Sequence, residues 1–207
     1  YHGLGKLGRH DATIAGLTHT TVDIRDRAGQ TLLRNYQPGD LWFGDWDHRL
    51  QYTARNKLYS APGYITSTIY EADGQTKEIT YANGVKTSFT YSPTRRWVTR
   101  ITTALGATTL MDRQYTRDTL GRITNIVGAS APGSWNYVYD NADRLISADN
   151  LGDNTLDETF VYAANDNMVS RTRVAGTYVY PAASAARPHA PVTVGTAAMA
   201  YDANGNL

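Results

Sequence analysis

The stretch Tyr201–Leu207 reads YDANGNL, and altered copies of this phrase recur from about residue 60 onward. Most copies have a tyrosine, an Asp or Asn within three residues, usually a glycine, and then a return to apolar residues. Asp and Asn hydrogen-bond their own backbone two residues on, and Gly and Asn tolerate the left-handed conformation of tight turns. The phrase therefore predicts a strand ending in tyrosine, a tight turn, and a second strand that begins with Leu or Ile.

The copies follow one another at a regular distance. Gly121, Asp143 and Asp166 occupy equivalent places and stand 22 and 23 residues apart, which leaves room for two strands and two turns in each period. Such self-similarity predicts an array whose units pack on their neighbours. Because Asp143 and Asp166 stand where other copies have glycine, we expect those turns to be more strained or of another type. The residues that define the copies are Tyr70, Gly74, Tyr81, Gly84, Asp118, Gly121, Arg122, Tyr139, Asp140, Arg144, Tyr162, Asn167, Tyr201, Asp202 and Gly205.

The segments between the turns alternate with a period of two, which is typical of half-buried strands. Val85, Thr87, Phe89 and Tyr91 share one face of such a segment. Fifteen tyrosines and eighteen glycines add the composition of strands and turns. The sequence thus predicts an all-β fold with little helix, in which consecutive antiparallel hairpins form one long, twisted and curved sheet.

Bulk properties exclude several classes of protein. Twenty Lys and Arg balance nineteen Asp and Glu, so no field of one sign gathers nucleic acid or an anionic membrane. Without cysteine, the chain has no disulfide framework and no thiolate metal site. No apolar run reaches the ~20 residues that span a bilayer, and no signal-peptide core precedes the repeats. Both ends look cut, so we expect the chain to be a fragment.

The chain divides into two regions by its pattern. Residues 1–60 form a divergent first segment, expected to be β, with one faint copy of the turn phrase at Asp26–Gly29. The four-residue spacing of apolar side chains within 45–61 fits a short amphipathic helix there. Residues 61–207 are the repeat region, and its stretch 181–191, PAASAARPHAP, suits an extended connection better than a central strand.

A glycine motif near the amino end matches the dinucleotide fingerprint only in letters. Gly3–Gly8 reads GLGKLG, and Asp23 falls about where a ribose-binding acid would lie. The fingerprint needs a buried strand before it and a helix after it, and this stretch has neither. We interpret it as a glycine turn and expect no cofactor.

An acidic cluster near residue 46 is the strongest catalytic candidate. Asp45 and Asp47 flank Trp46 and precede His48, a grouping that could act as an acid pair or as part of a metal site. No third ligand lies nearby in sequence, and the five histidines form no ligand pair. A solvated polar turn is the favoured interpretation, and a glycosidase using Asp45 and Asp47 is the least favoured function.

Two further motifs also have plainer explanations. Asp149, Asp153 and Asp157 suggest a calcium loop, but the glycine and the bidentate glutamate that an EF-hand requires are missing. Arg95-Arg96-Trp97 holds the elements of a nucleic-acid contact, yet the balanced charge favours a basic hairpin tip. No nucleophile elbow occurs. We therefore expect no catalytic, cofactor-binding or metal-binding residue and no enzymatic activity.

Several phrases resemble the YD repeats of bacterial Rhs proteins and of the C component of insecticidal toxin complexes. The resemblance covers roughly residues 60–207, and it departs from the family pattern where Arg117 replaces tyrosine and where Asp143 and Asp166 replace glycine. The phrases that carry it are YITSTIYEADGQ (64–75), ITYANGVKTSFTYSPTRRW (79–97), YTRDTLGRI (115–123), WNYVYDNADRLISADN (135–150), TFVYAANDNMVSRTR (159–173) and AYDANGNL (200–207).

The resemblance implies a structural function. In that family the repeats form an antiparallel sheet that spirals into a hollow shell around a toxic C-terminal domain, and no such domain is visible in this sequence. It implies a section of shell wall in a secreted or surface-displayed virulence protein, a polymorphic toxin, whose partners are neighbouring repeats and the enclosed effector. The alternative is an extracellular carbohydrate-binding or adhesive module that contacts surface glycans through Tyr and Trp. Because the cut ends leave strand edges unpaired, we expect the isolated chain to associate edge to edge.

Overall fold

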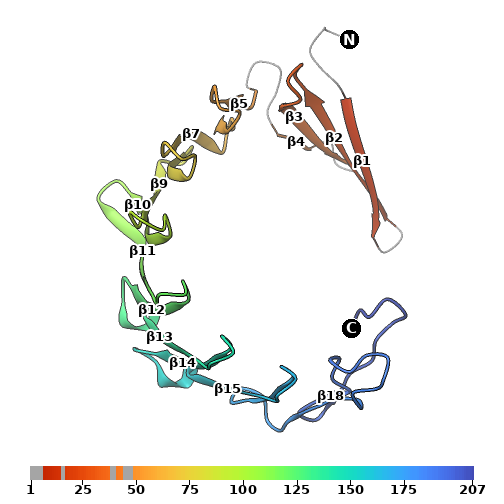
Figure 1. Ribbon diagram of the computed structural model, residues 1–207. Helices are drawn as coiled ribbons and strands as arrows, with labels where there is room; N and C mark the ends of the chain where they lie inside the picture. The colour runs from red at the N-terminus through yellow and green to blue at the C-terminus, as the bar shows by residue number, and fades with distance from the viewer. Residues whose placement is uncertain (1–6, 15–16, 38–40, 44–48) are drawn as a thin grey trace. The chain divides into compact units, whose positions relative to one another are not determined.

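The structure, a computed structural model, describes residues 7–14, 17–37, 41–43 and 49–207. The chain forms two compact units, Tyr1–Asp112 and Arg113–Leu207, which Figure 1 shows in red to green and in green to blue. Within the described ranges, the regular structure consists of strands and two single-turn 3-10 helices. The expected all-β fold of consecutive antiparallel hairpins is confirmed.

The first unit begins with a four-stranded antiparallel sheet whose strands pair in chain order. It consists of β1 (Leu7–Ile14), β2 (Leu17–Arg25), β3 (Thr31–Gln37) and β4 (Leu41–Phe43). Alternation along β3 points Leu33 and Asn35 to the same side, and both side chains are almost fully buried. Among the described residues of the first unit, Leu33 is the most deeply buried apolar side chain after Ala61.

The expected helix near residue 50 is wrong for the described residues of that stretch. They form a small hairpin of β5 (Gln51–Tyr52) and β6 (Leu58–Ser60). Leu50 and Leu58 stand on either side of its tight turn, so their spacing in sequence reflects a strand, a turn and a strand. Asp45, Asp47 and His48 lie outside the described residues.

A ten-stranded antiparallel sheet follows, again paired in chain order and open at both ends. Strand β11 contains the boundary between the units, so its first half belongs to the first unit and its second half to the second. The strands are β7 (Ile65–Tyr70), β8 (Thr76–Tyr81), β9 (Val85–Tyr91), β10 (Val98–Leu105), β11 (Thr108–Arg117), β12 (Ile123–Gly128), β13 (Trp135–Tyr139), β14 (Leu145–Asn150), β15 (Glu158–Tyr162) and β16 (Met168–Arg171).

A three-stranded sheet ends the second unit. It contains β17 (Tyr178–Val179), β18 (Thr193–Val194) and β19 (Ala197–Ala198). The Pro- and Ala-rich residues 181–191 connect β17 to β18 and contain no strand. Short-range turns such as the bond from Ala185 N–H to the carbonyl of Ala182 (2.9 Å) occur among them, and the carbonyls of Pro188 and Pro191 accept bonds from the side chains of Asn167 and Tyr201.

The two faces of the sheet differ in the second unit. Trp135 and Tyr137, two residues apart on β13, stack with ring centroids 6.1 Å apart. On the other face, the Asn136 side chain accepts a hydrogen bond from Asn125 (2.8 Å) and donates one to Asp149 (3.3 Å). Only Ala148 among the apolar side chains of this unit is buried in the described structure. Strand pairing and side-chain contacts between neighbouring strands therefore do more for this unit than a closed core.

Two loops at one edge of the second unit pack without room for a side chain. The first carries the 3-10 turn η1 (Ala131–Gly133) between β12 and β13, and the second carries η2 (Asn154–Leu156) between β14 and β15. A Cβ on Gly152 would lie 2.3 Å from the backbone nitrogen of Pro132. Asn150, which is fully buried, donates to the carbonyl of Pro132 at 2.9 Å.

Candidate functional site: the turn edge of the hairpins

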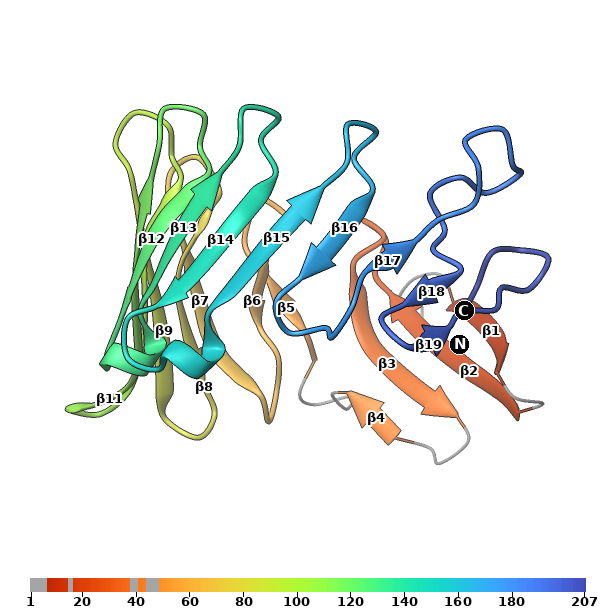
Figure 2. The same cartoon turned by 90° about the horizontal axis from the view of Figure 1, so that it is seen from below.

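Seven turns in the described part of the chain share one hydrogen-bond pattern. The N–H of the first residue donates to the carbonyl of the fifth, and the N–H of the fourth donates to the carbonyl of the first. This is the geometry of a three-residue hairpin loop that ends in a left-handed residue and a bulge. Figure 2 shows two of them, β13–β14 and β15–β16, projecting side by side from one edge of the second unit. The seven turns are Asp26–Gln30, Thr53–Lys57, Glu71–Gln75, Asp118–Arg122, Asp140–Arg144, Ala163–Asn167 and Asp202–Asn206.

The fourth residue of every one of these turns has a positive φ angle. Where it is not glycine, the angle is 62° at Asn56, 64° at Asp143 and 67° at Asp166, so these turns are of the same type as the glycine turns. Each aspartate binds an arginine of the preceding turn: Asp143 pairs with Arg122 at 2.6 Å and Asp166 with Arg144 at 2.9 Å. The acid that replaces glycine thus adds a bond between neighbouring hairpins, which offsets part of its backbone strain.

The aspartate at the first position holds the turn together. One oxygen of Asp140 accepts the backbone N–H groups of Ala142 (2.9 Å) and Arg144 (3.0 Å), and the other accepts the Arg144 guanidinium at 2.8 Å. These bonds, the one from the Arg144 side chain above all, hold the pKa of Asp140 below its usual range. Asp118 makes the same set of bonds with Leu120 and Arg122.

At four turns, the tyrosine directly before the turn donates its hydroxyl to the previous hairpin. Tyr139 donates its hydroxyl to the carbonyl of Ile123 at 2.8 Å, and Ile123 is the residue directly after the preceding turn. Burial raises the pKa of Tyr139. The same bond to the residue after the preceding turn recurs in the first unit, from Tyr52 to Thr31 (2.7 Å), from Tyr70 to Leu58 (2.6 Å) and from Tyr91 to Thr76 (2.5 Å).

A cation from the preceding turn covers the tyrosine ring. The guanidinium of Arg122 lies 4.9 Å from the ring centroid of Tyr139, and that of Arg144 lies 4.9 Å from the ring centroid of Tyr162. Arg144 also donates to the carbonyl of Ala163 at 2.9 Å. We call this contact between two successive hairpins a junction. It consists of the tyrosine before the second turn, the cation of the first turn, and the backbone carbonyl that one of these two side chains bonds. The tyrosine and the cation each have a polar end and an apolar or planar body. They can therefore pack on each other and form hydrogen bonds at the same time, so a junction joins two turns without a closed core.

Two of the repeat-defining residues from the sequence lie in a different kind of turn. Tyr81 and Gly84 bound the connection between β8 and β9, where the N–H of Gly84 donates to the carbonyl of Tyr81 at 3.0 Å. The hairpin β9–β10 instead turns through Ser92–Trp97, a longer turn in which Arg96 takes the left-handed conformation with φ 56°. Arg96 bonds Asp73 of the preceding turn at 2.6 Å.

The sequence reasoning missed two junction residues of the first unit. Tyr52 and Lys57 belong to a turn whose first residue is Thr53 and whose fourth is Asn56, so it lacks both the Asp and the Gly of the phrase. A tyrosine followed four residues later by Asn was the available signal. At Arg117, where the phrase has tyrosine, the guanidinium lies 5.7 Å from the Tyr115 ring of the same strand.

The other polar candidates have structural partners. Asp23 is fully buried and accepts two bonds from Arg34, at 2.6 and 3.0 Å, and one from Arg25 at 2.9 Å. The bonds from Arg34, followed by those from Arg25, hold the pKa of Asp23 below its usual range. Asp153 caps η2 through the Thr155 N–H at 3.0 Å.

The described part of the chain holds neither a cluster of metal-ligating side chains nor a helix that could cross a membrane. Within the ranges given above, no three His, Cys, Asp or Glu side chains gather as metal ligands. In the same ranges, no helix has the length and hydropathy needed to span a bilayer.

Comparison with known proteins identifies the repeat. The family model described as RHS Repeat matches residues 70–108, which run from the end of β7 to the start of β11. The chain carries an RHS repeat. The matched RHS segment includes the Glu71–Gln75 turn, the Ser92–Trp97 turn and the junction of Tyr91 with Thr76. No curated protein sequence matches the chain.

Solved structures with the same fold are toxin-complex proteins. The crystal structure of TcdB2-TccC3 has a TM-score of 0.67 and 20% identity, and the match covers 92% of this chain. That of TcdB2-TccC3-Cdc42 has a TM-score of 0.68, 18% identity and 92% coverage. The Tc holotoxin pore of Photorhabdus luminescens has a TM-score of 0.63, 18% identity and 91% coverage. The chain spans 12% of the length of each of these solved chains. At this identity the likeness establishes the fold.

Proposed function

We propose that this chain is a structural repeat module, a section of the wall of an Rhs-type shell. The observation that carries the proposal is the recurring junction, in which a tyrosine hydroxyl and an overlying cation join a hairpin to its predecessor, as at Tyr70 and Tyr139. Because each junction involves only neighbouring hairpins, any number of hairpins can follow one another, as the wall of a shell requires. The RHS repeat at residues 70–108 and the fold shared with the TcdB2-TccC3 structures support it.

The polar groups of the turn edge support a structural role over a catalytic one. The carboxylates of Asp118 and Asp140 are engaged by backbone N–H groups and by an arginine of their own turn. A general acid or base needs a pKa near the working pH, whereas the pKa of each of these groups is lowered. Their chemistry fits turn stabilisation.

We further propose that the complete polypeptide encloses a toxic C-terminal domain and acts outside the cell that makes it. The solved chains of the same fold are about eight times longer than this one, because each is covered to only 12%. A wall section of this length would need the remaining repeats of the same polypeptide to close around any contents.

Limited proteolysis of the complete encoded polypeptide tests the enclosure. We expect protease to leave a segment C-terminal to these repeats uncut in the native protein and to digest it once urea opens the wall, as read by mass spectrometry of the fragments. Equal cleavage of that segment in both conditions would contradict the proposal. So would a reading frame that ends at Leu207, since nothing would then remain to be enclosed.

A further inference from the structure

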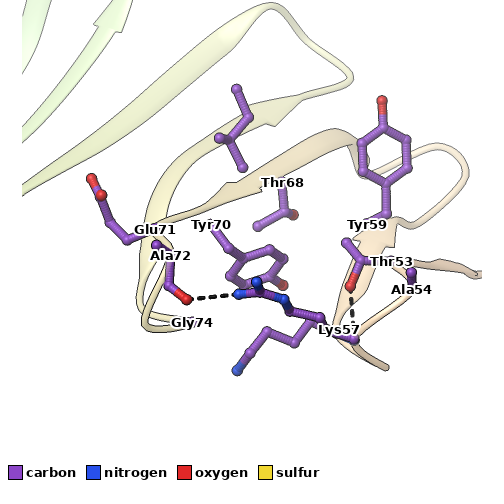
Figure 3. Close-up of a pocket in the computed structure, with 11 residues that line it drawn as sticks. Thr53, Ala54, Lys57, Tyr59, Thr68, Tyr70, Glu71, Ala72 and Gly74 are labelled. Carbon is purple, nitrogen blue, oxygen red and sulfur yellow. Dashed lines mark hydrogen bonds between the residues drawn. The ribbon is translucent and has the colours of Figure 1, made fainter.

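A groove of about 510 Å³ lies in the first unit between two successive turns, Thr53–Lys57 and Glu71–Gln75. Figure 3 shows the Tyr70 ring near the middle of this groove, with Thr68 beside it and Glu71 and Ala72 along the second turn. Tyr59, which is 41% exposed, lies across the groove from Glu71 and Ala72. The groove therefore occupies the junction at which β6 and β7 meet.

The cation of this junction lacks the partner that its counterparts have. In the second unit Arg122 and Arg144 each bond a carboxylate at the fourth position of the next turn. Here the cation is Lys57, whose ammonium lies 5.5 Å from the Tyr70 ring centroid, and the fourth residue of the next turn is Gly74. Among the described residues, no carboxylate forms an ion pair with Lys57.

The charges that line the groove are unbalanced in favour of cations. Arg55 donates to the carbonyl of Ala72 at 2.6 Å and has no ion pair among the residues that the structure describes. The single lining carboxylate, Glu71, faces Lys77 and Arg96, each at 3.9 Å. Two cations thus share a concave surface with an aromatic wall, which is suited to an anion that can also pack on a ring.

Gly74 lies directly beside the end of the Lys57 side chain, at the turn position that carries a carboxylate in the second unit. A Cβ built on Gly74 would lie 2.8 Å from Cε and 3.3 Å from the ammonium of Lys57. A side chain at this position is therefore in reach of the ammonium, and only the flexible end of Lys57 has to move. Asp143 and Asp166 place their carboxylates from the same turn position and with the same sign of φ.

We propose that this groove binds a carboxylate, supplied by a small organic acid or by an Asp or Glu side chain of a polypeptide. The carboxylate pairs with the Lys57 ammonium, with Arg55 beside it, and the carbon chain next to it packs on Tyr70. It takes the place that the aspartate of the following turn holds at the junctions of Arg122 and Arg144. This inference does not depend on the proposed enclosure.

A nuclear magnetic resonance titration of the 207-residue chain tests the inference. The probes are acetate, with chloride at equal ionic strength as its control, and a blocked Gly-Asp-Gly peptide, with blocked Gly-Asn-Gly as its control. We expect the amide signals of Lys57 and Gly74 to shift with acetate or with the aspartyl peptide and not with the controls. Tighter binding of the peptide than of acetate assigns the site to a polypeptide side chain, and the reverse assigns it to a free acid. Equal shifts with probe and control, or none with either probe, would overturn the proposal.

Substitutions at the groove locate the binding. Lys57→Gln should weaken the aspartyl peptide about tenfold, the effect of losing one charge-assisted bond. Gly74→Asp should block binding by supplying the carboxylate from within the chain, whereas Gly74→Asn, which changes the backbone equally, should leave it. Lys77→Gln, outside the groove, is the control for charge alone. Wild-type affinity in Gly74→Asp would refute the site even if Lys57→Gln failed to fold.

Discussion

At the scale of single residues, a junction tyrosine such as Tyr139 makes two separate contributions. Its ring lies under the guanidinium of Arg122 in the preceding turn, and its hydroxyl donates to the backbone carbonyl of Ile123. Losing a hydrogen bond to a carbonyl that is partly withdrawn from water costs free energy, so the hydroxyl contributes in addition to the ring. Tyr139 shows both contacts, and phenylalanine could supply only the first.

Replacing Tyr139 by phenylalanine separates the two contributions. Because Tyr139→Phe removes the 2.8 Å bond to Ile123 and keeps the ring, we expect it to lower the free energy of unfolding by about 1 kcal/mol in urea titrations. Tyr59→Phe removes an exposed hydroxyl and should change it by less than about 0.5 kcal/mol. Equal effects of the two substitutions would contradict the junction.

The turn aspartates predict acid sensitivity. The pKa is lowered at Asp140 and Asp202 by the bonds within their turns and at Asp73 by Arg96. A lowered pKa in the folded state gives stability that is present above the unfolded value, about 3.9, and is lost as the pH falls through the folded value. We expect the urea midpoint to be constant from pH 7 to about pH 5 and to fall steadily toward pH 2. In Asp140→Asn the fall should be shallower, and a midpoint as high at pH 2 as at pH 7 would be inconsistent with this origin.

At the scale of elements, the hairpins differ at their two edges. At the turn edge, neighbouring hairpins meet through long side chains, such as that of Arg144, which can adjust. At the edge with η1 and η2, backbone meets backbone, and Gly128 and Gly152 leave no space for a side chain. A substitution should therefore be tolerated better at the first edge than at the second.

The turn edge should accept glycine at Asp143 and reject alanine. Asp143→Gly loses the exposed ion pair to Arg122 and relieves a positive φ, so we expect a change within about 0.5 kcal/mol. Asp143→Ala loses the pair and keeps the strain, at a cost of about 1 kcal/mol, as Gly121→Ala should in the neighbouring turn. Thermal unfolding of the three variants measures this order, and a neutral Asp143→Ala would show that the pair is not what makes the position tolerable.

The edge that carries η1 and η2 should not tolerate a side chain at Gly152. A methyl group on Gly152 would lie 2.3 Å from the Pro132 nitrogen and 2.4 Å from the Ala131 carbonyl carbon. We expect Gly152→Ala to destabilise the chain by about 2–3 kcal/mol, measured by chemical denaturation. Gly133→Ala is the matched control, since its methyl would meet nothing closer than 3.5 Å. If both variants unfold at the same denaturant concentration, the loops are not packed in this way.

At the scale of the whole molecule, the fold follows from one local rule that the sequence displays. Asp at the first turn position bonds the backbone of its own turn, and Gly at the fourth position adopts a positive φ. The hairpins around Gly121 and Asp140 could therefore be predicted from the residues alone. The hairpin at Thr53–Lys57 was mistaken for a helix because Thr and Asn replace those two residues.

The junctions could not be predicted in the same way. They join residues of successive repeats, as Arg144 joins Asp166, and no spacing in sequence states which carbonyl a tyrosine will reach. The tight loops around Asn150 have no sequence signature beyond single glycines. The curvature of the sheet and the enclosure of a further domain stay predictions.

The central claim is that each hairpin is held by its neighbours through the junctions, and hydrogen–deuterium exchange tests it most directly. In Arg144→Gln, which removes the bonds to Ala163 and Asp166 and the cover of Tyr162, amide exchange should accelerate in β13–β16 and stay unchanged in β1–β4. Acceleration confined to residue 144 and its immediate neighbours, or spread equally over the whole chain, would contradict the account.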